Sequence, residues 1–187
     1  MIMKTLALAG LTLSVSTNAA LLDFGNFTTE TVTNRDWLDL TETTNMSYNQ
    51  VVSELQLGGQ LAGWTVASFS DVNELFDNAG GDGVYPGPQP LVASTLFPLW
   101  GITNTSTNAT WAHVADLSQS QDPAIVTSGF IFDADGTQFY TDNFSLSASV
   151  QSRIGTALYR TSNVPVPAAA WLFGSALIGL AGIKRKK

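Results

Sequence analysis

The chain has 187 residues, of which 44% are hydrophobic and 12% are charged, and its formal net charge is −7. This composition is too apolar for a disordered chain, and the length leaves room for one folded domain of ordinary size. The absence of cysteine excludes disulfides, thiolate metal centres and cysteine nucleophiles.

The charges are unevenly distributed along the sequence. Five of the eight basic residues lie in the two end segments, 1–19 and 164–187, which contain no acidic residue. The body therefore has three arginines, Arg35, Arg153 and Arg160, against 15 acidic residues, a difference of −12. Because binding of nucleic acid depends on Lys and Arg meeting phosphates, we expect no nucleic-acid partner.

Residues 1–19 have the pattern of a secretory signal peptide. Lys4 supplies a positive charge, residues 6–15 are mostly apolar, and small residues precede an expected cleavage site after Ala19. A short buried helix is the alternative interpretation. The pattern indicates export, with the globular domain covering residues 20–163.

The first half of this domain is predicted to mix strands with two short helices. Residues 21–27, 36–40 and 64–67 have the short, partly apolar pattern of strands. A helix is expected from Ser47, where a capping-box spacing precedes an apolar face, up to the glycines at 58–59. A second short helix, with a serine cap at Ser70, is expected over residues 70–76.

The second half, from Leu91 onward, is predicted to be mostly strands. Residues 110–115, 125–132, 139–144 and 157–160 are β-like runs that alternate with Asn, Asp, Gly and Pro clusters. The expected fold is therefore α+β, a single small domain with a mostly antiparallel sheet, flanked by an N-terminal signal helix and a C-terminal transmembrane helix.

Few residues carry a recognisable catalytic or metal-binding pattern. His113, the single histidine, lies in an alternating segment, so an ordinary strand histidine is favoured over a catalytic base. The acidic turns at 77–83 and 133–136 favour hairpins, with a calcium site as the alternative. We expect no catalytic residue and no resident cofactor. Among the aromatic residues, Trp100 and Trp111 are the candidates for a ligand surface, although core packing is the default for tryptophan.

The C-terminal segment combines a proline motif, an apolar stretch and a basic cluster. Residues 168–183 carry no charge, and as a helix they rise about 24 Å, close to the roughly 30 Å of a hydrocarbon core. The basic cluster opposes translocation, which keeps this end cytoplasmic. The motif is Val164, Pro165, Val166 and Pro167, and the cluster is Lys184, Arg185, Lys186 and Lys187.

This arrangement resembles the sorting tail of PEP-CTERM proteins, the substrates of exosortases, in a variant in which Val166 replaces the glutamate between the prolines. The resemblance implies recognition by an exosortase-type membrane enzyme, an inner-membrane precursor, removal of the tail and delivery to the cell surface or an exopolysaccharide matrix. A plain single-pass anchor, which would keep the tail, is the alternative.

The body also resembles known domains in the order of several residues. These are Trp37, Trp64, the pair Glu74–Leu75 and the later segments 100–103 and 157–160. The order of these residues is similar to a domain common among PEP-CTERM proteins and, more distantly, to the Lcl C-terminal domains of bacterial adhesins. That resemblance implies a C-type lectin-like fold and a non-enzymatic binding or structural module, with polysaccharide as the ligand. Thr65 departs from the pattern, which has arginine after the tryptophan. A small secreted hydrolase that uses carboxylates is the rival hypothesis.

Overall fold

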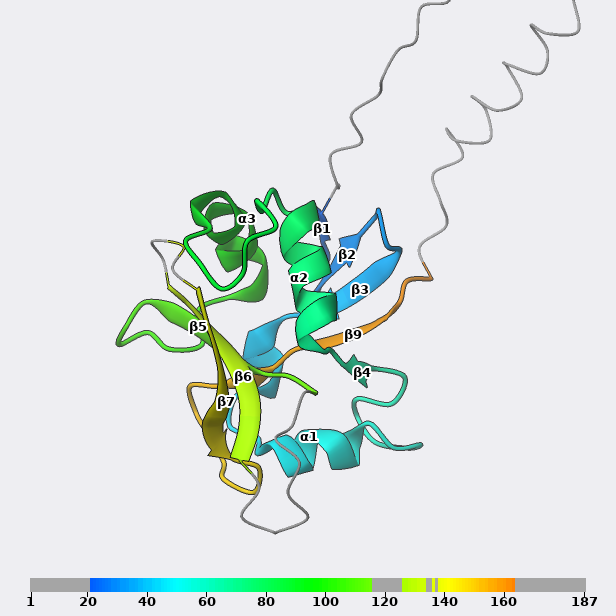
Figure 1. The fold of residues 1–187 in the computed structure, drawn as a ribbon. Helices are drawn as coiled ribbons and strands as arrows, with labels where there is room; N and C mark the ends of the chain where they lie inside the picture. Colours follow the sequence, from blue (N-terminus) through cyan, green and yellow to red (C-terminus); the bar gives the residue numbers. More distant parts are fainter. Residues whose placement is uncertain (1–20, 116–125, 134–135, 137, 164–187) are drawn as a thin grey trace, which may run out of the picture.

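Two β-sheets form the frame of the molecule, and helices fill the space beside them (Figure 1). This computed structural model describes residues 21–115, 126–133, 136 and 138–163. The first sheet has the order β1 (Leu21–Asp23), β2 (Phe27–Glu30), β3 (Arg35–Leu38), β9 (Leu158–Thr161) and β4 (Thr65–Val66). The second has the order β7 (Gln138–Leu146), β6 (Val126–Asp133), β5 (Ala109–His113) and β8 (Gly155–Thr156). All pairings are antiparallel except β5 with β8.

Four helical elements complete the α+β fold. These are the 3-10 helix η1 (Leu40–Thr43), α1 (Tyr48–Glu54), α2 (Phe69–Asn78) and α3 (Pro90–Trp100). Both α1 and α2 begin with a capping box, in which a serine side chain and the residue three positions later satisfy each other's backbone amides. The expected cap of α1 at Ser47 is confirmed, whereas α2 is capped by Ser68 and not by Ser70.

Helix α3 is the main departure from the sequence-based prediction, which assigned mostly strands after Leu91. Pro90 fits the first turn of a helix, where the missing amide hydrogen has no helical partner to lose. Val92, Leu96 and Trp100 then recur at intervals of four and lie buried on one face. The four strands predicted in the second half correspond to β5, β6, β7 and β9 and are confirmed, with shifts of a few residues at their ends.

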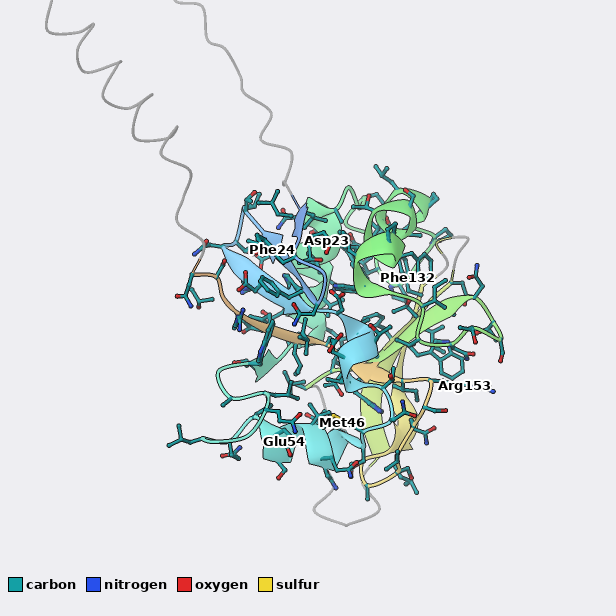
Figure 2. All side chains as sticks on the ribbon, turned by 180° about the vertical axis from the view of Figure 1, so that it is seen from behind. Asp23, Phe24, Met46, Glu54, Phe132 and Arg153 are labelled. Atoms are coloured by element: carbon teal, nitrogen blue, oxygen red, sulfur yellow. The ribbon has the colours of Figure 1, made fainter. Side chains whose placement is uncertain are left out.

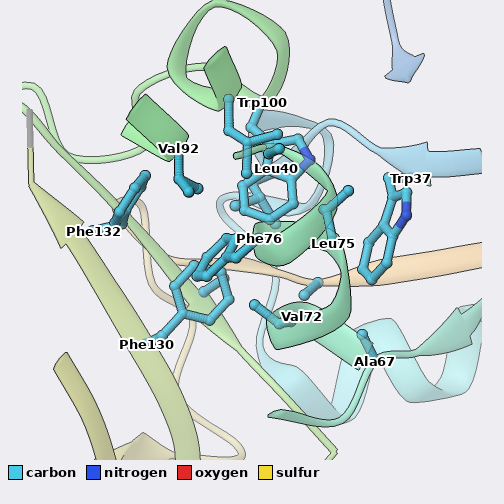
Figure 3. Close-up of a cluster of buried hydrophobic side chains, with 14 of the residues drawn as sticks. Trp37, Leu40, Ala67, Val72, Leu75, Phe76, Val92, Trp100, Phe130 and Phe132 are labelled. Atoms are coloured by element: carbon cyan, nitrogen blue, oxygen red, sulfur yellow. The ribbon is translucent and has the colours of Figure 1, made fainter. Parts of the chain in front are cut away.

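The main hydrophobic core lies between α2, α3 and β6 (Figure 3). The ring of Phe76 stacks on Phe132 with centroids 5.3 Å apart and meets the edge of Phe130 at 5.9 Å. Trp100 lies 6.0 Å from Phe76. Burial of each of these side chains contributes about 1.5–3 kcal/mol, and aromatic pairs add roughly 0.5–1.5 kcal/mol.

Short segments tie the two sheets together. The amide of Ala67 donates to the carbonyl of Ala157 at 2.8 Å, and the amide of Ala157 donates to the carbonyl of His113 at 2.9 Å. Ala115 donates in turn to the carbonyl of Ala67 at 2.8 Å. The two linking alanines, Ala67 and Ala157, are almost fully buried.

The two expected end segments, 1–19 and 164–187, lie outside the described residues. Within the part of the chain that the structure describes, no helix has both the length and the apolar content needed to cross a bilayer. The signal peptide and the transmembrane helix at 168–183 therefore stay predictions.

Candidate functional site

A cleft of about 280 Å³ opens between the first sheet and α1, and we call it the Arg160 cleft. Its apolar lining comes from the sheet, from the residue before the α1 cap and from the loop after α1. Leu38 is buried, whereas the other apolar side chains are half-buried. Met46 lies at the α1 end of the molecule, away from Phe24 beside β1 (Figure 2). The apolar lining consists of Phe27, Leu38, Met46, Leu61 and Trp64.

Arg160 is held in a stack of aromatic rings along this cleft. Its guanidinium carbon lies 4.3 Å from the centre of a Trp64 ring and 5.1 Å from the centre of the Phe27 ring. Phe27 stacks in turn on Phe24, with centroids 4.9 Å apart and planes within 7°. Each cation–π contact contributes about 0.5–2 kcal/mol, depending on how far it is shielded from water. The stack therefore joins three parts of the chain that are distant in sequence: Arg160, Trp64, and the neighbouring pair Phe24 and Phe27.

The buried carboxylate of Asp36 holds the Arg160 side chain in place. Arg160 Nε donates to Asp36 Oδ2 at 3.0 Å, and the Thr29 hydroxyl donates to Asp36 Oδ1 at 2.7 Å. Burial by itself raises the pKa of Asp36, but hydrogen bonds from Thr29, Ser162 and Arg160 and the arginine charge outweigh it and hold this pKa below its ordinary value. Asp36 thus stays ionised and neutralises the arginine.

Polar side chains complete the cleft, and two of them are carboxylates. Glu42 is exposed on η1, and Glu54 is half-buried at the last residue of α1. The backbone amide of Gln60 donates to Glu54 Oε2 at 2.8 Å, so the loop after α1 folds back over this carboxylate. Asn26 and Gln60 are exposed and add amide groups. Neither glutamate forms an ion pair with an arginine in the described part of the chain.

Gly59 allows the loop after α1 to pack against the backbone at the end of this helix. A Cβ atom at this position would overlap the carbonyl group of Glu54. The amide of Leu61 donates to that same carbonyl at 3.1 Å, and the amide of Trp64 donates to the carbonyl of Leu61 at 3.1 Å. The glycine therefore positions Trp64 against the sheet.

Asp39 lies next to the cleft, between Leu38 of β3 and η1. Its side chain is 8% exposed, and its Oδ1 has no hydrogen-bond partner among the described residues. Burial, together with the nearby charges of Asp23 and Glu42, raises the pKa of Asp39 to about 6. The region around the cleft therefore carries an excess of negative charge.

The two tryptophans predicted as a ligand surface lie elsewhere. Trp100 is 1% exposed and packs between Trp37, Phe76 and Phe130. The expectation of a ligand surface at Trp100 is wrong, because the helical face of α3 turns this ring into the core. Trp111 is half-buried on β5, opposite Ile131, and does not line the Arg160 cleft.

His113 and the acidic turn at 77–83 have structural surroundings. His113 is buried on β5 with its ring edge-on to Tyr48, and burial lowers its pKa to about 4. Asp77 accepts a hydrogen bond from the Tyr85 hydroxyl, and Asp82 accepts one from the side chain of Gln89. Across the described ranges, no three His, Cys, Asp or Glu side chains are grouped so that they could hold a metal ion. Part of the other acidic turn, residues 134–135, lies outside those ranges.

A second, larger hollow of about 430 Å³ lies at the opposite end of the first sheet. Leu21, Leu91 and Leu99 supply most of its apolar surface, and Asn78 is its one side-chain amide. This hollow has no charged residue in its described lining. It offers fewer directional contacts to a ligand than the Arg160 cleft does.

None of the charged residues of the cleft was predicted as a functional residue from the sequence. One signal was present, because Arg160 is one of only three basic residues in a strongly acidic body. A cation that is rare in such a chain commonly has a dedicated partner, here Asp36. Glu42 and Glu54 gave no comparable signal among 15 acidic residues.

Comparison with known proteins finds no matching family model, no matching curated protein and no matching solved structure. The resemblances of the tail and of the body therefore stay predictions from the sequence.

Proposed function

We propose that this chain is an exported surface or extracellular-matrix protein whose folded domain binds polysaccharide in the Arg160 cleft. In this proposal, an exosortase-type membrane enzyme recognises the tail and removes it. The folded domain acts as a binding module and not as an enzyme. The observation that supports the binding role most directly is the cleft, with its half-buried apolar lining and exposed polar groups.

The proposed address comes from the sequence of the tail. Val164 to Pro167 precede an uncharged stretch and a basic cluster in the order that PEP-CTERM tails have. Two prolines hold this backbone extended and remove two amide donors, which suits a segment that a processing enzyme must grip as an extended chain. A plain anchor does not require such a motif.

The cleft suits a sugar because a pyranose ring has both apolar and polar surfaces. Its C–H faces pack against apolar side chains, and its hydroxyls hydrogen-bond to carboxylates and amides. The Arg160 cleft supplies the first from Trp64, Met46 and Leu61 and the second from Glu42 and Gln60. Small-molecule sites generally combine a mostly apolar lining with a few polar groups in this way.

Hydrolysis of a glycoside is the second candidate, because Glu42 and Glu54 line one cleft. Glycosidases commonly use a pair of carboxylates on opposite sides of the scissile bond. Release of reducing ends from a polysaccharide by the purified protein, lost when Glu42→Gln is introduced, would establish this activity. Binding without release is the outcome expected from our proposal.

Intact mass spectrometry of the protein from its native host tests the proposed processing. We expect the wild-type protein to lack the residues beyond the Val164–Pro167 motif, and the double variant Pro165→Ala, Pro167→Ala to keep them. A variant with Pro123→Ala, which changes a proline outside the motif, serves as the control and should be processed normally. A full-length tail in all three proteins would mean a plain membrane anchor.

A further inference from the structure

The Arg160 cleft has an unbalanced charge. Arg160 is the one basic residue among the described residues that line it, and that charge is already matched by Asp36 at 3.0 Å. Glu42 and Glu54 then remain as two negative charges on the cleft surface. Asp39 adds to the negative potential whenever it is ionised, because its charge is close enough to Glu42 for the two to interact.

We propose that the Arg160 cleft binds a cationic amino sugar, namely glucosamine units with a free amine within a polysaccharide. This inference rests on the proposed function and names the class of sugar that the cleft takes. The ammonium group pairs with Glu42 and Glu54, and the apolar face of the sugar ring packs against the lining formed by Trp64, Met46 and Leu61.

The charge of the cleft selects among the common classes of polysaccharide. A uronic acid or a sulfated sugar brings its negative charge toward Glu42 and Glu54, and this repulsion opposes binding. A neutral sugar hydrogen-bonds to the carboxylates without compensating their charge. An ammonium group forms charge-assisted hydrogen bonds, which are about twice as strong as neutral ones.

The size of the cleft limits how much of the polymer it holds. Its volume of about 280 Å³ is near the lower end of small-molecule sites, which begin at roughly 300 Å³. The cleft therefore takes one sugar unit, while the neighbouring units lie along its exposed edges at Asn26 and Gln60. Affinity for a single unit is expected to be weak, and a polymer with many amines gains from repeated binding.

The acidic body of the domain favours the same class of ligand at longer range. Residues 20–163 contain three arginines and 15 acidic residues. Such a field raises the local concentration of a polycation and accelerates its encounter with the cleft. The attraction weakens as salt is added, because at 0.1 M ionic strength interactions between exposed charges more than about 10 Å apart are largely screened.

Calorimetric titration of the full chain in a nonionic detergent tests the inference. Three oligosaccharides of equal length serve as probes at mildly acidic pH, where the glucosamine amines are protonated: oligoglucosamine, its fully N-acetylated form and oligogalacturonic acid. We expect oligoglucosamine to bind about tenfold more tightly than the N-acetylated form, because acetylation removes the charge that pairs with the glutamates. Oligogalacturonic acid should bind most weakly.

Variants that each remove one carboxylate test whether the preference for oligoglucosamine arises in the Arg160 cleft. Glu42→Gln and Glu54→Gln should each weaken oligoglucosamine binding by about three- to tenfold, with little change for the N-acetylated form. Glu74→Gln is the control for loss of one negative charge outside the cleft, because Glu74 is exposed on α2, where it pairs with Arg35 at 2.9 Å. It should leave both affinities unchanged.

Each contrary result has a separate meaning. Equal or tighter binding of the N-acetylated oligomer, with no effect of the two cleft variants, would overturn the amino-sugar inference and keep polysaccharide binding. Absence of binding to all three probes would overturn both this inference and the proposed binding role. Tighter binding of a lysine-rich peptide, with the same dependence on Glu42 and Glu54, would assign the cleft to a protein ligand instead.

Discussion

Two buried titratable residues, Asp39 and His113, should oppose each other in the pH dependence of stability. The pKa of Asp39 is raised from 3.8 to about 6, so the folded state holds this proton more tightly than the unfolded state and stability falls as the pH rises between these values. The pKa of His113 is lowered from 6.5 to about 4, so the unfolded state takes up a proton first and stability falls as the pH decreases. Between about pH 4 and pH 6, the two effects on the free energy of unfolding largely cancel.

Replacement of Asp39 should reveal the pH dependence of stability that comes from His113. We expect Asp39→Asn to raise the free energy of unfolding at neutral pH by on the order of 1 kcal/mol, because it removes a buried charge. Stability of the variant should then decline as the pH falls from 6.5 toward 4, whereas that of the wild type changes little. Urea unfolding, followed by tryptophan fluorescence at several pH values, measures both. An unchanged pH profile in Asp39→Asn would contradict the prediction, and Glu74→Gln supplies the control.

At the scale of elements, the short strand β8 links β5 to η1. It pairs in parallel with β5, and the amide of Thr156 donates to Thr43 Oγ1 of η1 at 2.7 Å. The preceding Gly155 is buried against the backbone of η1, and a Cβ atom there would overlap the carbonyl oxygen of Leu40. The close approach of β8 to η1 therefore requires glycine.

The variant Gly155→Ala tests this requirement. We expect it to lower the free energy of unfolding by about 1–3 kcal/mol, the usual range for an overpacked core position. Its urea midpoint should fall relative to wild type. Ser152→Ala changes an exposed residue of the preceding turn and should keep the wild-type midpoint. Equal midpoints for both variants would show that β8 and η1 can separate without cost.

The elements could be predicted where a local signal was sufficient. The cap of α1 at Ser47 and the strands β5, β6 and β7 of the second sheet followed from residues that are close in sequence. Helix α3 was missed because a run rich in Leu, Val and Phe fits a buried helix as well as a strand, and only packing decides between them. The order of strands in the sheets has no local signal, since β3 and β9 are more than 100 residues apart.

The Arg160 cleft was even less predictable than the fold. Its wall forms only when Phe27, Trp64 and Arg160 meet from three separate strands and loops, so no short motif encodes it. The sequence instead indicates Trp100 and Trp111 as candidates for a ligand surface, with core packing as the default, because a large aromatic residue suits either role. Burial separates a core tryptophan from one that can meet a ligand: Trp100 is 1% exposed, whereas Trp64 is only half-buried.

At the scale of the whole molecule, the two described ends of the chain leave from one end of the first sheet. Leu21 pairs with Glu30, Glu30 with Arg35 and Arg35 with Thr161, so these residues lie in one row across four strands (Figure 1). Leu38, which lines the Arg160 cleft, is three residues farther along β3, about 10 Å away from the row. Arg160 is next to the row on β9, whereas the α1 side of the cleft, at Met46 and Glu54, lies away from Asp23 of β1 (Figure 2).

This geometry predicts how the domain is presented before its tail is removed. In the proposed precursor, four residues separate Asn163 from the membrane segment, and four residues span at most about 14 Å. The row at Arg35 should then face the membrane and the cleft should face outward. Because the chain has no cysteine, single cysteines can report this orientation without background labelling.

Two exposed positions allow a direct comparison. Leu57 lies in the loop beside the cleft, and Val32 lies in the turn next to the row. In cells that carry the unprocessed Pro165→Ala, Pro167→Ala chain, we expect a bulky maleimide reagent to label Leu57→Cys several-fold faster than Val32→Cys. In detergent, where no bilayer shields either face, the difference in labelling rate should largely disappear. A faster reaction at Val32→Cys in cells would reverse the predicted orientation, and the cleft would then face the membrane that the tail enters.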